Sequence, residues 1–206
     1  FLATNHAREA YADVEIACMR DGRVVGLRGR FEVDNGAYVR TNGFTGPCNV
    51  ALFMSGPYFV PNIALDAAVF MTNKTPAGTY RGPGRFEASF FCERLFEMAA
   101  RDLDIDPVEF RRRNLIEESR MPYKLAGMRH KDPLAETWCD NGAYAEVLER
   151  CVEAFDWKGK WDLQGKKIDG RYHGLGLACF IEGGGAGREG CRMVLEKDGG
   201  VSVYVG

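Results

Sequence analysis

The chain has 206 residues, of which 46% are hydrophobic and 27% charged, so it is long enough and apolar enough to bury a core. A formal net charge of -2 gives no general attraction for nucleic acid or for an anionic membrane. No apolar run approaches the roughly 20 residues that a membrane-spanning helix needs. These features argue against nucleic-acid-binding and membrane-spanning classes.

The first half of the chain predicts strands. Polar and apolar residues alternate over residues 13–20 and 24–33, and the Asp21-Gly22 pair between them predicts a hairpin turn. Residues 41–47, rich in Gly, Thr and Asn, are predicted to form a loop. Residues 63–72 predict a further strand, apolar on both faces in places and therefore buried.

A loop and two helices are predicted next. Residues 75–85 contain two prolines and three glycines, which predicts a loop of special backbone geometry. Apolar residues at helical spacing predict a helix over residues 87–103, and the Phe90, Phe91 and Phe96 cluster is expected in the core. Asp106-Pro107-Val108-Glu109 predicts a second helix start, with an Asp106 cap and a capping box completed by Glu109.

The remaining residues are predicted to form a connection, a helix and then strands, in which polar and apolar residues alternate. Residues 117–142 are predicted to be a long connection, and residues 143–155 a helix. Strands are then predicted over residues 172–181, 191–197 and 201–205, with a tight turn at Asp198-Gly199-Gly200. This order of elements predicts an α+β fold. Its expected parts are a strand-rich region (1–85), a helical middle with a connection (86–170) and the start of a second strand region (171–206).

Metal-ligand spacing is missing from the cysteines and histidines. The seven cysteines are scattered without a CxxC, and the three histidines lie far apart in sequence. The cysteine pattern predicts reduced thiols in a cytoplasmic protein. No metal site built from protein side chains is predicted.

The segment Tyr80-Arg81-Gly82-Pro83-Gly84-Arg85 holds the strongest chemical pattern. Glycines at 82 and 84 let the backbone approach a ligand and expose its N–H groups, and the two arginines add positive charge ahead of a helix N-terminus. The pattern predicts a site for a phosphate, a carboxylate or an oxo group on a metal. The alternative is a simple turn between strand and helix. The run Arg111-Arg112-Arg113 is interpreted as a solvated helix face.

Read together, several segments resemble one enzyme family, and in its order. Tyr80 to Arg85, Glu93-Arg94 and the sequence DPVEFRRRNLI of residues 106–116 resemble the large, molybdopterin-binding subunit of molybdenum hydroxylases. This is the group of xanthine dehydrogenase, aldehyde oxidase and carbon monoxide dehydrogenase. Shorter matches are DNGAY (34–38), VPNI (60–63), GLG (174–176), FIE (180–182) and Asp198-Gly199. The resemblance covers nearly the whole chain.

The resemblance implies roles for the matched residues. The segment of Tyr80, Arg81, Gly82, Gly84 and Arg85 would lie beside the molybdenum and bind the cofactor through its main-chain amides. The substrate pocket would be lined by Pro83 and, on a second wall, by Phe180, Ile181 and Glu182. The general-base glutamate of the family would lie beyond Gly206, so no catalytic residue is assigned here. By this resemblance, the chain would be an internal fragment that is inactive by itself.

Two differences from the sequence motifs of the family restrict the expected class of substrate. Carbon monoxide-oxidising members carry Cys and Ser after the arginine of the loop, with copper on the Cys, whereas this chain has Gly82-Pro83. Xanthine-oxidising members carry a substrate-orienting arginine shortly before the P-N-I segment, and residues 48–52 contain none. These differences favour an aldehyde or an N-heteroaromatic substrate over carbon monoxide or a purine.

The resemblance also implies cofactors and partners. Molybdenum would be held by molybdopterin in its cytosine dinucleotide form, and [2Fe-2S] clusters and FAD would belong to partner subunits or domains. The reaction implied is hydroxylation with water as the oxygen donor. Two alternatives stay open: a non-catalytic binding or assembly module that retains the fold, and a phosphate-binding protein that uses residues 81–85.

Overall fold

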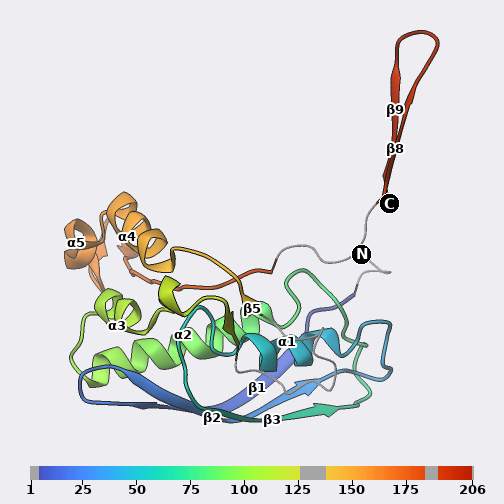
Figure 1. Cartoon of the computed structure of the whole chain (residues 1–206). Coiled ribbons are helices and arrows are strands. Elements are labelled where there is room, and N and C mark those ends of the chain that lie inside the picture. Colours follow the sequence, from blue (N-terminus) through green and yellow to red (C-terminus); the bar gives the residue numbers. More distant parts are fainter. Residues whose placement is uncertain (1–4, 126–137, 184–189, 206) are drawn as a thin grey trace.

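The computed structural model describes residues 5–125, 138–183 and 190–205, and Figure 1 shows the arrangement of its helices and strands. A three-stranded sheet is formed by β1 (Glu9–Cys18), β2 (Val24–Asp34) and β3 (Ile63–Phe70), with β2 in the middle. β1 and β2 are antiparallel, which confirms the predicted hairpin. β2 and β3 are parallel, so the chain must cross over between them. The mixture of helices and strands confirms the α+β prediction.

The crossover contains α1 (Thr45–Phe53), a helix that the sequence did not predict. The expected loop over residues 41–47 is wrong in its last part, because the helix already begins at Thr45. Pro47 is compatible with a first helical turn, where its missing N–H has no intrahelical partner. The helix is largely buried, with Val50, Ala51 and Phe53 among its buried residues, so it lacks the polar stripe that reveals a helix in sequence.

β3 is an edge strand, so the expectation that it is buried on both faces is wrong. Its residues are all half-buried or exposed. Among the described residues it pairs only with β2, and its other edge has no strand beside it. An apolar run in sequence does not distinguish a central strand from an edge strand, because the difference lies in which neighbours the fold supplies.

α2 (Arg85–Asp102) lies over the sheet (Figure 1) and agrees with the predicted helix over residues 87–103. Phe96 is fully buried, with its ring centroid 3.9 Å from that of Tyr58 and 5.3 Å from that of Phe110. Phe90, expected in the core, is 66% exposed because the buried face of α2 runs through residues such as Cys92, Leu95 and Phe96. The prediction for Phe90 is therefore wrong.

α3 (Pro107–Asn114) begins as predicted. The Asp106 side chain accepts the N–H groups of Val108 and Glu109 at 2.9 Å each, and Pro107 occupies the first turn. The Glu109 carboxylate pairs with Arg112 and Arg113 instead of reaching back to the cap. The capping-box part of the prediction is therefore wrong, since nearby cations compete for the glutamate.

The expected connection over residues 117–142 contains a 3₁₀ turn (Glu118–Arg120) and the antiparallel pair β4 (Tyr123–Lys124) and β5 (Trp138–Cys139); residues 126–137 lie outside the described part. α4 (Tyr144–Phe155) confirms the predicted helix and is followed by α5 (Trp157–Lys160) and a 3₁₀ turn (Trp161–Leu163). The described part of the chain has no helix with the length and apolar character needed to cross a bilayer.

The last third contains two small hairpins. β6 (Lys167–Ile168) pairs with β7 (Arg171–Tyr172), and β8 (Cys191–Leu195) pairs with β9 (Val201–Val205), which confirms the turn predicted at Asp198 to Gly200. In Figure 1 the β8–β9 hairpin extends away from the other elements. The division of the chain at residues 85 and 170 stays a prediction.

The predicted strand over residues 172–181 is wrong beyond Tyr172. Residues 173–183 form no strand, and no described strand runs beside them to complete a ladder. The period of two is nevertheless real, because Leu175, Leu177 and Cys179 are half-buried and pack against the main core while the residues between them are exposed. Alternating burial thus arises here from packing on the core, without sheet hydrogen bonds.

Candidate functional site

The segment from Thr79 to Arg85, called here the cofactor loop, turns sharply at the start of α2. The Arg85 N–H donates to the Gly82 carbonyl at 3.1 Å, and Gly82 and Gly84 have φ of 64° and 79°. A Cβ at residue 84 would lie 2.1 Å from the Gly46 carbonyl oxygen, so only glycine fits there. The loop is therefore pressed against the start of α1.

Hydrogen bonds to its carbonyl groups hold the loop in place. The Asn49 side-chain amide donates to the Pro83 carbonyl at 2.8 Å, and the Asn5 amide donates to the Thr79 carbonyl at 3.1 Å. The main-chain N–H groups of Arg81 and Gly82 donate to no other residue that the structure describes. The arrangement fixes the acceptors of the loop and leaves donors available for a ligand.

The side chains of the loop divide between exposed and buried positions. Tyr80 is 50% exposed and Arg81 is also exposed, whereas Pro83 and Gly84 are buried. Arg85 is half-buried, and its guanidinium lies 5.1 Å from the centre of the Phe53 ring. Only one of the two arginines is therefore free to extend from the loop toward a ligand.

Glu182 lies beside the loop although it comes 97 positions (182 − 85) after Arg85 in the sequence. Its carboxylate Oε1 lies 3.0 Å from Nη1 of Arg85. Ile181 packs in a small second core with Phe53 and other buried residues, while Phe180 is 70% exposed. The structure thus brings Glu182, from the second predicted wall, beside Arg85 at the end of the loop. The binding roles of these residues stay predictions.

A buried ion pair supports the loop and was missed by sequence reasoning. Nε of Arg8 lies 2.8 Å from Oε1 of Glu87, and Nη1 of Arg8 donates to the Tyr80 carbonyl at 2.9 Å. The exposed fractions of the two side chains are 3% and 8%. Arg8 lies in none of the matched motifs, and the only local signal was an acidic residue in the first turn of a helix.

A second buried pair fixes the segment that carries Glu182. Arg111 Nε donates to Glu93 Oε2 at 2.8 Å, and Arg111 Nη2 donates to the Leu177 carbonyl at 3.0 Å. The Tyr58 hydroxyl donates to Glu93 Oε1 at 2.6 Å, and burial raises the pKa of that hydroxyl, with Glu93 adding to the rise. The prediction of a solvated Arg111 is wrong, because α3 turns this one arginine into the core.

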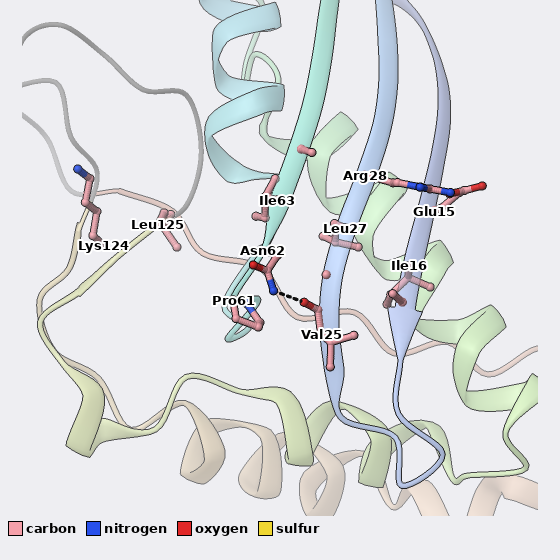
Figure 2. Close-up of a pocket in the computed structure, with 13 residues that line it drawn as sticks. Glu15, Ile16, Val25, Leu27, Arg28, Pro61, Asn62, Ile63, Lys124 and Leu125 are labelled. Atoms are coloured by element: carbon pink, nitrogen blue, oxygen red, sulfur yellow. Dashed lines mark hydrogen bonds and ion pairs between the residues drawn. The ribbon is translucent and has the colours of Figure 1, made fainter.

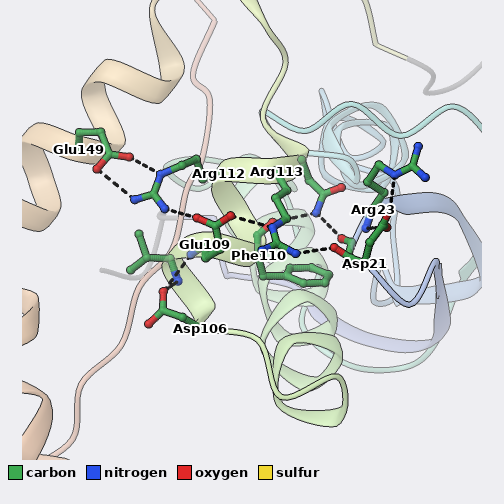
Figure 3. A network of polar contacts seen from close by, with 11 residues as sticks. Asp21, Arg23, Asp106, Glu109, Phe110, Arg112, Arg113 and Glu149 are labelled. Carbon is green, nitrogen blue, oxygen red and sulfur yellow. Dashed lines mark hydrogen bonds and ion pairs between the residues drawn. The ribbon is translucent and has the colours of Figure 1, made fainter.

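The other two arginines of the run are on the surface, as predicted. Figure 3 shows Arg112 between Glu109 and Glu149, and Arg113 beside Glu109 and the Asp21 carbonyl. The hydrogen bond from Arg113, and after it that from Arg112, lowers the pKa of Glu109. This network joins α3 to α4 and to the β1–β2 turn, and it lies apart from the cofactor loop.

The DNGAY segment fastens the end of β2 to the residues that precede the loop. Asp34 Oδ1 accepts the Gly36 N–H at 2.9 Å and the Thr72 hydroxyl at 2.7 Å, and these bonds lower the pKa of Asp34. The Asn35 carbonyl accepts the Ala77 N–H at 3.1 Å. The motif therefore anchors the start of the loop segment.

A separate hollow of about 990 Å³ lies at the other end of β2 and β3 (Figure 2). Its walls include Leu27, Pro61, Ile63 and Leu125, and the Asn62 side chain that borders it donates to the Val25 carbonyl at 2.8 Å. The VPNI segment thus starts β3 beside β2. None of the nine predicted site residues lines this hollow, so it is not the predicted substrate pocket.

Protein ligands for a metal ion are not gathered anywhere in the part of the chain that the structure describes. Within those residues, no three His, Cys, Asp or Glu side chains form a group that could hold one. The seven cysteines are free thiols.

Comparison with known proteins identifies the family. Residues 1–115 match the family model of the molybdopterin cofactor-binding domain. Over 98% of its length the chain is 33% identical to the 6-hydroxypseudooxynicotine dehydrogenase complex subunit gamma of Paenarthrobacter nicotinovorans, of which it spans 24%.

Solved structures agree with this assignment. The quinoline 2-oxidoreductase of Pseudomonas putida 86 is 27% identical, with a TM-score of 0.67 over 78% of this chain and 20% of that one. The aldehyde oxidoreductase of Desulfovibrio desulfuricans, 18% identical, shares the fold with a TM-score of 0.73 over 97% of this chain and 21% of its own. The resemblance seen in the motifs is confirmed: the chain belongs to the molybdopterin cofactor-binding domain family.

Proposed function

We propose that the full-length protein is a molybdenum-dependent oxidoreductase that hydroxylates an aldehyde or N-heteroaromatic carbon with water as the oxygen donor. The observation that carries this proposal is the cofactor loop, in a chain of the molybdopterin-binding family. The loop has two arginines and main-chain donors that have no acceptor within the described residues. The chain spans about a quarter of the relative named above, so the activity proposed is that of the longer protein.

The residues present fit a molybdopterin group. The N–H groups of Arg81 and Gly82 have no acceptor within the described residues, while the carbonyls of Thr79 and Pro83 accept from Asn5 and Asn49. Nε of Arg85 is buried and has no hydrogen-bond partner in the described residues. Donors without acceptors suit an anionic, oxygen-rich ligand.

We assign the residues of this chain to binding and positioning. Tyr80, Arg81, Gly82, Gly84 and Arg85 would hold the cofactor, and the metal in molybdopterin would supply the redox chemistry when bound. Pro83 on the loop and Phe180, Ile181 and Glu182 opposite would bound the substrate pocket. An ion pair between Arg85 and Glu182 connects these two sides. The general base remains assigned to the part of the protein outside this chain.

The proposed substrate class is supported by what two segments of the sequence lack. Gly82-Pro83 offers no thiolate for copper, and residues 48–52 offer no arginine to orient a purine. Two similar proteins are named for nicotine-derived and quinoline substrates, which contain aromatic nitrogen rings. These observations favour an N-heteroaromatic compound or an aldehyde.

We further propose the cofactor form and the partners. The cofactor would be the cytosine dinucleotide form of molybdopterin, with [2Fe-2S] clusters and FAD in partner subunits or domains, in the cytoplasm. The similar P. nicotinovorans protein is named as a subunit of a complex, which supports partner subunits. Metal analysis of the purified full-length complex should find one molybdenum per chain, and a screen of aldehydes and N-heterocycles with an acceptor dye should find turnover. Absence of molybdenum, or no turnover in the screen, would contradict the proposal.

Arg81→Ala in the full-length protein tests the loop directly. Because the Arg81 side chain is exposed and makes no hydrogen bond or ion pair within the described residues, its loss should leave folding intact. Loss of a charge-assisted hydrogen bond to a ligand should lower turnover about tenfold or more. Arg20→Ala, an exposed arginine at the β1–β2 turn, is the matched control and should keep wild-type rates. Wild-type kinetics and cofactor content in Arg81→Ala would show that this arginine has no role in the site.

A further inference from the structure

The cofactor loop is held at its base by the N-terminal segment of the chain. Residues His6 and Ala77 form a parallel bridge, and the Gly78 N–H donates to the His6 carbonyl at 3.3 Å. Just beyond this bridge, Arg8 turns inward under the loop. Its stem packs on the start of α1, where a Cβ at Gly46 would lie 3.4 Å from Arg8 Cδ. The N-terminal segment, the start of α1 and the cofactor loop therefore meet at the Arg8 side chain.

The guanidinium of Arg8 connects the loop to the helix that follows it. It donates to the Glu87 carboxylate in the first turn of α2 and to the Tyr80 carbonyl, at 2.8 and 2.9 Å. Its central carbon also lies 4.9 Å from the centre of the Phe86 ring. A planar guanidinium can serve two acceptors in fixed directions, which a lysine ammonium on a flexible stem does not do.

Arg8 and Glu87 each have one polar side-chain atom that makes no hydrogen bond with a described residue. Nη2 of Arg8 and Oε2 of Glu87 are buried and have no partner in the described part of the chain. A buried charge pair with unused capacity contributes less to global stability than a fully bonded one. The pair acts more strongly on the loop than on global stability. The reason is that Arg8 is the only described donor to the Tyr80 carbonyl.

We infer that Arg8 is a positioning residue for the cofactor loop: by fixing the Tyr80 carbonyl against the start of α2, it sets the direction of the main-chain N–H groups that follow. This inference rests on the proposed function. It adds a residue from the N-terminal strand region, in no matched motif, to the machinery that orders the loop.

The test uses the full-length complex with Arg8→Met, Arg8→Lys and the control Arg28→Met. Arg28 is an arginine of β2 whose ion pair with Glu15 is exposed. In Arg8→Met, amide hydrogen exchange over residues 79–85 should speed up about tenfold, as expected for loss of one buried charge-assisted hydrogen bond. Exchange over α3 should stay at the wild-type rate, and bound molybdenum should dissociate faster on dilution.

The lysine variant separates positioning from stability. Arg8→Lys keeps the charge beside Glu87, so its thermal midpoint should return toward wild type, while exchange in the loop should stay fast because the second acceptor is lost. Full recovery of loop exchange by lysine would overturn the inference. Wild-type loop exchange in Arg8→Met, or a loosened loop with unchanged molybdenum retention, would overturn it as well. Absence of molybdenum from the wild-type complex is a different result, which contradicts the proposed function alone.

Discussion

Two buried arginine–glutamate pairs use the same helix and differ in how completely they are bonded. Glu87 of α2 pairs with Arg8, and Glu93 of α2 pairs with Arg111; all four side chains are less than one-tenth exposed. Arg111 also donates to two carbonyls, and Glu93 also accepts the Tyr58 hydroxyl. Arg8 and Glu87 each keep a buried atom without a described partner.

This difference indicates that the Arg111–Glu93 pair stabilises the fold, whereas the Arg8–Glu87 pair positions a loop. A buried ion pair stabilises only where hydrogen bonds compensate the loss of hydration, and breaking a compensated pair leaves an isolated charge. Arg111 joins α2, α3 and the Leu177 segment within the core. Arg8 acts at the border between the core and the candidate site. Three further variants can break or sharpen this comparison.

Arg111→Met should give the largest effect. It leaves the Glu93 carboxylate buried without its cation, which costs about 3–5 kcal/mol in comparable cases. Native-state hydrogen exchange of α2 and α3 amides in the full-length protein measures this loss. The effect on α3 should exceed that of Arg8→Met.

The control for this variant is Arg112→Met, whose ion pairs with Glu109 and Glu149 lie on the surface. It should cost less than about 1 kcal/mol. Equal losses in the two variants would show that burial and complete bonding do not distinguish Arg111, and the comparison would fail.

Asp106→Ala should have an intermediate effect. The side chain accepts two N–H groups at the start of α3, and loss of such a cap costs about 1 kcal/mol. The first turn also presents the Pro107 carbonyl to Arg111, so exchange should quicken there first. Asp106→Asn, which can cap as well, is the matched control. If alanine and asparagine behave alike, the cap contributes nothing to holding Arg111 in place.

Local features of the fold could be predicted from sequence, whereas features set by distant partners could not. The Asp21-Gly22 and Asp198-Gly199 turns and the Asp106 cap depend on neighbouring residues, and all three predictions are confirmed. The period of two over residues 172–181 predicted a strand, but a ladder needs a second strand that the described fold does not provide. Pairing partners are not encoded in a single stretch.

The same limit applies to the candidate site. The loop residues were found because their glycines and arginines form a pattern, and Glu182 because of its matched motif. Which arginine of the run 111–113 turns inward depends on where α3 packs, and a local reading could not decide it. Arg8 is separated from the Tyr80 carbonyl by 72 residues and has no motif around it, so only the fold shows the contact.

Glu109→Gln should give the smallest effect and the only one that depends on pH. Glu109 lies on α3 beside Arg112 and Arg113, and their hydrogen bonds lower its pKa in the folded protein. A lowered pKa stabilises the fold above the unfolded value, which is about 4.3 for glutamate, and this contribution is lost as pH falls through the folded pKa.

At neutral pH the variant should therefore be less stable by less than about 1 kcal/mol, because the pair is partly exposed and screened by salt. The gap between the thermal midpoints of wild type and variant should close as the pH falls below about 4. Glu153→Gln, an exposed carboxylate of α4 without an ion pair in the described residues, should show no such gap. A gap that widens in acid would reverse the sign of the Glu109 contribution. A gap as large as that of Arg111→Met would mean that surface pairs, and not the buried ones, fix α3.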